Sequence, residues 1–140
     1  MFTSETKRER THYFKTGFVY LIAAVFCALF GAVYEHYSHE VYSYYMIYAF
    51  AFPLVLGTLP FFIIYSCKKI KPISRVSENL YNAGIGTLTV GSIIQGVLII
   101  YGTTNSLTHF YWIVGVGLIV AATVIYITEC VFSKIGINKQ

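Results

Sequence analysis

The sequence predicts an all-α integral membrane protein, with four transmembrane helices in two antiparallel hairpins that pack as a four-helix bundle. Three observations lead to this prediction: a low content of charge, long uncharged stretches, and a one-sided distribution of Lys and Arg. Only 11% of the 140 residues are charged and 56% are hydrophobic, whereas soluble domains usually carry about 25% charged residues. A domain this small cannot hide so much apolar surface from water. We therefore expect lipid to be its solvent.

Uncharged stretches of sequence mark the predicted spans. Residues 16–34 and 41–67 carry no charge, and each stretch is long enough to cross a hydrocarbon core of about 30 Å. The stretch 79–128 also lacks formal charge, but it is too long for one span of about 20 residues. Within it, the sequence Gly-Thr-Thr-Asn-Ser at 102–106 combines a helix-stopping glycine with capping residues. The single transmembrane domain 1–140 is therefore predicted to have spans at 16–37, 42–66, 80–102 and 108–132.

The positions of Lys and Arg predict the orientation in the membrane. All 10 of these residues lie before the first span, between the second and third, or after the fourth. Because positive loops stay in the cytoplasm, we expect both ends to be cytoplasmic, in a multi-pass protein of the plasma membrane. The loops near 35–42 and 103–108 should then face outward. Basic clusters beside apolar runs are typical of topology determinants, so we expect no nucleic-acid partner.

The third span differs from the others because small and polar residues line two of its faces. Small residues let helix backbones approach closely, and this drives association within a membrane. We therefore expect the third helix to be central or to lie at a subunit contact, in a homo-oligomer or a complex with a larger membrane protein. The residues with which we expect close packing are Gly84, Gly91 and Gly96 on the third span, and Gly117 and Ala121 on the fourth.

Two prolines interrupt the second span. Proline removes a backbone donor and clashes with the preceding turn, so a kink is expected near Pro53, with Pro60 on the same face. Such a kink can open a cavity or act as a hinge. It can equally be a bend that only improves packing.

One constellation on the predicted outer face could carry chemistry. Glu35, His36, His39 and Glu40 lie at the first hairpin, and His109 opens the fourth helix on the same side. On a helix, His36 and His39 would share a face, and two imidazoles with flanking carboxylates suit a transition metal. The alternatives are a haem site, a proton or cation site, or polar groups that only cap the hairpin.

Tyrosines and mid-span polar residues extend this hypothesis. Tyr34, Tyr37, Tyr42 and Tyr45 surround the constellation, either as an aromatic belt at the interface or as a vestibule that binds an organic cation by cation–π contact. Deeper in the bilayer, a polar path could run past three residues of the third span: Gln95, Thr87 and Ser92. We expect no carboxylate at depth, although proton-coupled pumps generally need one.

Three functions are therefore open. The first is a small homo-oligomeric transporter, channel or ligand-binding protein entered through the outer constellation. The second is a haem- or metal-binding protein that uses the outer histidines. The third is an accessory or assembly subunit of a larger membrane complex. The sequence gives little reason to expect an enzyme, because it contains no phosphate loop and no evident pair of nucleophile and base.

Overall fold

The computed structural model describes residues 2–67 and 69–137, which form helices joined by turns and loops and contain no strand. Helix α1 (Phe2–Tyr37) is followed by an irregular second span, helix α4 (Arg75–Ile100) and helix α5 (Thr108–Ile137). Four helical segments are long and apolar enough to cross a membrane: Lys7–Tyr37, Tyr44–Ser66, Arg75–Ile100 and Thr108–Gly136. The predicted class is confirmed to this extent: the protein is helical, and four of its helical segments are long and apolar enough to cross a membrane.

The helices extend further than the uncharged stretches. Helix α1 begins at Phe2 rather than near residue 16, α4 begins at Arg75 rather than 80, and α5 continues to Ile137 rather than 132. At the start of α4 the extension has a local cause, since the Ser74 hydroxyl accepts a hydrogen bond from the backbone N–H of Ser77, 3.3 Å away. Such a cap satisfies one of the free donors of the first turn. As a result, charged residues lie on helical turns and not only in loops.

The turn predicted at 102–106 has a defined geometry. Gly102 adopts a φ of 71°, which is the left-handed conformation that glycine adopts without strain. The Gly102 N–H donates to the Ile99 carbonyl at 3.0 Å, and the Thr103 N–H donates to the Leu98 carbonyl at 2.9 Å. This pair of bonds is the Schellman motif that ends helices.

The second span is built from four short pieces. They are α2 (Tyr44–Ile47), a 3₁₀ turn η1 (Tyr48–Phe50), a π-helical segment η2 (Phe52–Thr58) and α3 (Leu59–Ser66). Because Pro60 has no N–H, the Leu56 carbonyl lacks its usual helical donor, and the Tyr81 hydroxyl donates to it instead at 2.7 Å. The π-helical segment thus contains Pro53 and ends two residues before Pro60. The kink expected near Pro53 stays a prediction.

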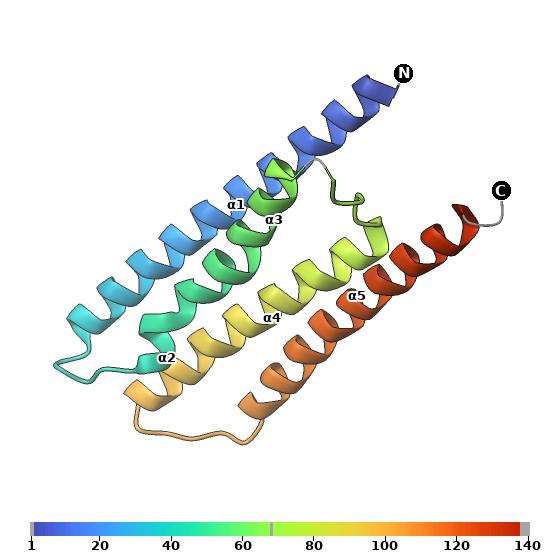
Figure 1. Ribbon diagram of the computed structural model, residues 1–140. Coiled ribbons are helices and arrows are strands. Elements are labelled where there is room, and N and C mark those ends of the chain that lie inside the picture. Colours follow the sequence, from blue (N-terminus) through green and yellow to red (C-terminus); the bar gives the residue numbers. More distant parts are fainter. Residues whose placement is uncertain (1, 68, 138–140) are drawn as a thin grey trace.

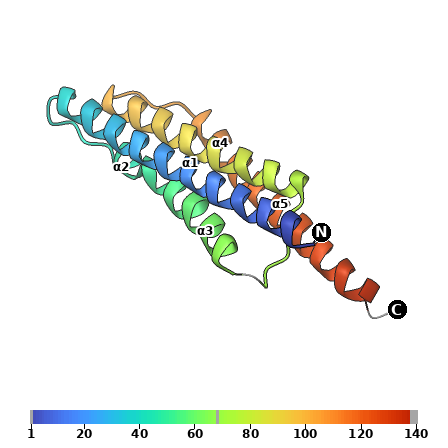
Figure 2. The ribbon, with the colours of Figure 1, turned by 90° about the horizontal axis from the view of Figure 1, so that it is seen from above.

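The four spans lie side by side in a row (Figure 1). The second span contacts α1 on one side and α4 on the other, and α4 also contacts α5. Within the described residues, no Cα atom of α1 lies within 8 Å of a Cα atom of α5. The expected closure into a four-helix bundle is therefore not confirmed. The view from above shows the same long axes running nearly parallel (Figure 2).

Glycines set the close approach of α4 to its two neighbours. A Cβ at Gly84 would lie 2.9 Å from the Gly115 carbonyl oxygen and 2.6 Å from Ile119 Cγ1, both on α5. A Cβ at Gly91 would lie 2.5 Å from Tyr111 Cβ on α5, whereas one at Gly96 would lie 3.0 Å from the Met46 backbone on α2. Helix α4 is therefore one of the two inner helices of the row, together with the second span. Gly117 has no such neighbour within 4 Å, and Ala121 is exposed.

A pair of glycine substitutions tests this packing. We expect Gly84→Ala to destabilise the folded protein by about 1–3 kcal/mol, because the added methyl group meets backbone that cannot move aside. Gly86→Ala, on the same helix, adds a methyl group where nothing lies within 4 Å, so it should be neutral or stabilise by about 0.5–1 kcal/mol. Reversible unfolding in mixed detergent micelles measures both. Equal stability of the two variants would contradict this packing.

Candidate binding site at the basic end

The most buried carboxylate among the described residues lies in the first turn of α4. Glu78 is only 9% exposed, and its Oε1 lies 2.9 Å from Nε2 of His12 on α1. The tautomer and charge of the imidazole decide which of the two groups donates, and an N–H at Nε2 donates to the carboxylate oxygen. The His12 side chain is 59% exposed. The pair therefore joins a buried carboxyl group to a side chain that water reaches.

The first turn of a helix is a favourable place for this charge. The positive end of the helix dipole stabilises a carboxylate there, as do the free N–H groups of the first turn. Glu78 is the acidic residue in the first turn of α4. The end of the molecule where Glu78 lies carries the basic segments 7–15 and 69–75 and is called here the basic end. The end with the loops 38–43 and 101–107 is called the hairpin end (Figure 1).

A cluster of aromatic rings lies next to Glu78. Phe61, 1% exposed, has the rings of Tyr13, Tyr20 and Tyr81 around it at centroid distances of 6.3, 5.8 and 6.3 Å. Each hydroxyl has a partner. The Ile73 N–H donates to Tyr13 at 2.9 Å, Tyr81 donates to Leu56 as described, and Tyr20 donates to Oδ1 of Asn82 at 2.6 Å. Asn82, one helical turn after Glu78 on α4, thus provides a second polar contact with α1.

A polar cleft of about 840 Å³ opens between α1 and α4 at the basic end. Its wall contains two carboxylates and two guanidinium groups besides His12. These guanidinium groups, from Arg8 and Arg75, belong to exposed residues, whereas Glu78 is buried. The full lining, called here the basic-end cleft, is Arg8, Glu9, His12, Tyr13, Thr16, Ile73, Arg75, Glu78, Asn79 and Asn82.

A smaller, apolar groove lies on the other side of Glu78. It has a volume of about 200 Å³ and is formed by α3, α4 and α5. Glu78 and Ile73 line both this groove and the basic-end cleft. The groove's lining, called here the apolar groove, is Pro60, Phe61, Ile64, Ile73, Ser77, Glu78, Tyr81, Ala122, Thr123 and Tyr126.

The residues of the predicted metal or cation site lie at the hairpin end. Helix α1 ends at Tyr37, and His39 and Glu40 adopt φ values of 53° and 69° in the turn that follows. The helical spacing assumed for His36, His39 and Glu40 therefore does not hold. Glu35 Oε1 is buried without a hydrogen-bond partner among the described residues.

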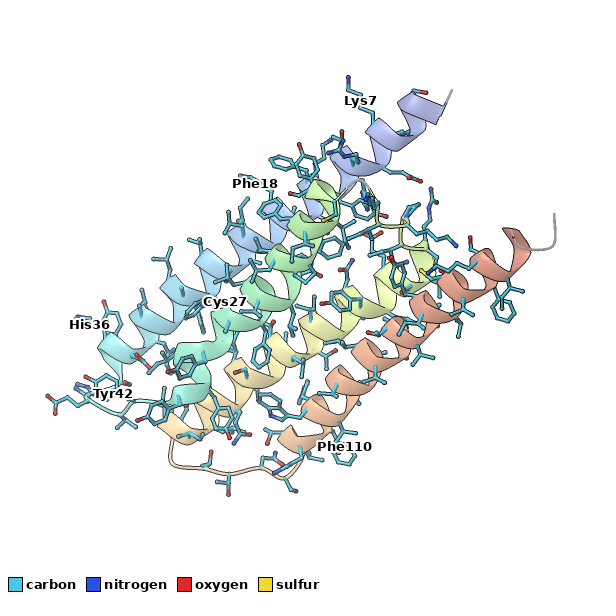
Figure 3. The ribbon with its side chains drawn as sticks, viewed as in Figure 1. Lys7, Phe18, Cys27, His36, Tyr42 and Phe110 are labelled. Carbon is cyan, nitrogen blue, oxygen red and sulfur yellow. The ribbon has the colours of Figure 1, made fainter. Side chains whose placement is uncertain are left out.

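His109 lies apart from these residues. It lies in the first turn of α5, and no Cα atom of α5 lies within 8 Å of one on α1. Figure 3 shows the labelled residues His36 and Phe110 well apart. Within 2–67 and 69–137, no three His, Cys, Asp or Glu residues lie close enough to hold a metal ion. Ligation of a metal or haem by these histidines stays a prediction.

The tyrosines of the predicted vestibule and the residues of the predicted polar path lie in several different environments. Tyr34 and Tyr37 line an apolar pocket of about 340 Å³ with Tyr101, Tyr42 is exposed, and the Tyr45 ring meets Trp112 edge to face at 6.0 Å. Gln95 is half-buried. The hydroxyls of two path residues bind backbone carbonyls, Thr87 to Ala83 at 2.7 Å and Ser92 to Tyr45 at 2.6 Å. The vestibule and the polar path stay predictions.

Sequence reasoning missed the Glu78 site. Counting the uncharged stretch from residue 79 placed Glu78 in a loop, although α4 begins at Arg75. One pattern could have indicated the site: Glu78 and Asn82 are four residues apart, so they share a helix face. Their partners on α1, His12 and Tyr20, are 66 and 62 residues away. No local pattern indicates such pairings.

Comparison with known proteins adds no assignment. No protein-family model, no curated protein and no solved structure matches this chain.

A single hydroxyl tests the polar contact between α1 and α4. We expect Tyr20→Phe to lower the free energy of unfolding by about 1 kcal/mol, because it removes the donor to the Asn82 side chain in a half-buried site. Tyr37→Phe removes the same atom from a side chain that is 75% exposed and should change little. Unfolding of both variants in detergent gives the comparison. An unchanged Tyr20→Phe protein would show that this contact does not stabilise the fold.

Proposed function

We propose that this chain is a multi-pass protein of the plasma membrane, with both ends in the cytoplasm, and that it binds a small cation at Glu78 through the basic-end cleft. Four helices long and apolar enough to span the bilayer support the first part. The positions of Lys and Arg support the orientation, because they make the basic end cytoplasmic. The cleft then opens toward the cytoplasm.

The burial of Glu78 is the observation that carries the binding proposal. A carboxylate in a membrane protein is costly to bury, and ionisable residues inside spans usually mark a site of function. Glu78 lies in the first turn of the candidate span Arg75–Ile100, is 9% exposed, and forms part of the wall of a cleft of about 840 Å³. Its hydrogen-bond partner, His12, is mostly exposed, so a ligand can reach the carboxylate without unfolding the core.

The balance of charge in the cleft favours a cation at its inner wall. Arg8 and Arg75 are exposed, so water and salt screen their charges. Glu78 is buried, and its charge is screened much less. The neighbouring Asn82 and Thr16 supply neutral oxygen atoms in the same lining. Electrostatic attraction for a small cation is therefore expected to be strongest beside Glu78.

This proposal keeps the transport or binding class predicted from sequence but moves its site from the hairpin end to the basic end. Binding at the cytoplasmic side is a step that a transporter and a simple binding protein share. A route onward past Gln95, Thr87 and Ser92 stays a prediction, as does a homo-oligomer. Helix α5 favours a role in a larger assembly as second candidate. Only 11% of its apolar window is buried, which leaves most of its surface to lipid or a partner.

Thiol labelling tests the orientation and the access to the cleft. We expect Thr16→Cys, in a background without Cys27, Cys67 and Cys130, to react with a membrane-impermeant maleimide in inside-out vesicles and not in right-side-out vesicles. Leu29→Cys, on an α1 side chain that is 62% exposed at mid-span and so faces lipid, should react in neither. Labelling of Thr16→Cys from the outside only would reverse the orientation.

A minimal cation tests the site itself. Tetramethylammonium, titrated into the detergent-solubilised protein and followed by ligand-detected NMR, should bind saturably. Glu78→Gln should weaken this binding about tenfold or more, which corresponds to about 1.4 kcal/mol, because it removes the charge and keeps the shape. The control is Glu129→Gln, which removes a carboxylate on α5 outside the cleft lining. Equal affinity of the Glu78→Gln and wild-type proteins would exclude Glu78 as the site.

A further inference from the structure

We propose that the apolar groove holds the apolar body of the ligand, so that the ligand is an organic cation with an aromatic or alkyl group. This inference rests on the proposed cation site at Glu78 and adds the chemical class of the ligand. The geometric basis is the position of Glu78, which lines both the polar cleft and the apolar groove. The surface of the groove is almost entirely apolar, whereas that of the cleft is more polar. We therefore place the ammonium group at the Glu78 carboxylate on the cleft side and the apolar body in the adjoining groove.

The size and lining of the groove suit one small apolar group. Its volume of about 200 Å³ exceeds that of apolar protein cavities of about 150 Å³ that hold benzene. Phe61, Ile64 and Ala122 contribute hydrocarbon surface to the lining. Burial of one ring or a short alkyl chain there removes apolar surface from water, which favours binding roughly in proportion to the area buried.

Two tyrosines make the groove suitable for a cation and not only for an apolar molecule. The Tyr81 and Tyr126 hydroxyls already donate to the backbone carbonyls of Leu56 and Lys71, at 2.7 and 3.1 Å. Their rings line the groove on α4 and α5. Aromatic rings attract a cation within about 6 Å of the ring centroid, most strongly where water is excluded. A cationic ligand whose apolar body enters the groove would therefore also lie beside aromatic rings.

Other ligand classes fit the groove less well. An anionic ligand would be repelled by the buried Glu78 charge. A neutral apolar molecule would fill the groove but would leave the carboxylate without a counter-charge on that side. An inorganic cation would use Glu78 and leave the groove empty. Only an organic cation with an apolar body uses both the charge and the groove.

The experiment compares two cations that differ by one phenyl ring. Tetramethylammonium reports on Glu78 alone, whereas benzyltrimethylammonium adds a ring for the groove. We expect the benzyl compound to bind the wild-type protein about tenfold more tightly or better, because a buried ring of this size contributes roughly as much as a buried Phe side chain. Glu78→Gln should weaken the binding of both compounds.

A matched pair of variants on α5 tests whether the phenyl ring of benzyltrimethylammonium binds in the apolar groove. Thr123→Trp fills the groove from its exposed rim, because Thr123 lines it. Val120→Trp places the same side chain on an exposed site of α5 outside the groove. Thr123→Trp should abolish the advantage of the benzyl compound and leave tetramethylammonium binding unchanged, whereas Val120→Trp should preserve both. Circular dichroism and gel filtration confirm that each variant is folded.

The outcomes separate this inference from the proposed function. If both compounds bind the wild-type protein equally and Glu78→Gln weakens both, the groove proposal is overturned and the cation site stands. The same holds if Thr123→Trp and Val120→Trp behave alike. If neither compound binds the wild-type protein, or if Glu78→Gln leaves tetramethylammonium binding intact, the cation site is overturned and the groove proposal with it. A Glu78→Gln protein that fails to fold leaves the α5 pair as the deciding test.

Discussion

Close packing of α4 against its two neighbours is the constraint on which the rest of the structure depends. Lipid gives no hydrophobic driving force between helices, so contact between backbones has to hold them together. Gly84 and Gly91 make room for α5, and Gly96 makes room for the second span on another face. With α4 fixed between them, the first turn of α4 brings Glu78 to the place where the cleft and the groove meet.

The irregular second span shows how a membrane helix tolerates two prolines. In a bilayer each freed backbone group needs a partner within the protein. The Tyr81 hydroxyl supplies one for the Leu56 carbonyl, and the same tyrosine lines the apolar groove. Gly57 lets the Tyr20 ring lie against the π-helical segment, since a Cβ there would come within 2.4 Å of Tyr20 Cγ. The same tyrosines that contact the irregular second span therefore also form the aromatic cluster around Phe61.

Glu78 connects this packing to the proposed function. Its side chain is buried, hydrogen-bonded to the exposed His12, and lines both a polar and an apolar space. This position is the basis on which we propose that a cationic ligand binds there. The hairpin end offers polar residues as well, but no Cα atom of α1, which carries His36, lies within 8 Å of a Cα atom of α5, which carries His109.

The sequence by itself determined the number of spans, the turn at 102–106 and the two small-residue faces of α4. These features are local, because hydrophobic run length, a helix-stopping glycine and the 3.6-residue period are read along one segment. Only the tertiary structure decided the row of helices, the separation of α1 from α5 and the Glu78 site. The contacts of Glu78 with His12 and of Asn82 with Tyr20 join residues 66 and 62 positions apart. Such pairings depend on which helix faces meet, and the pattern within any one helix leaves that choice open.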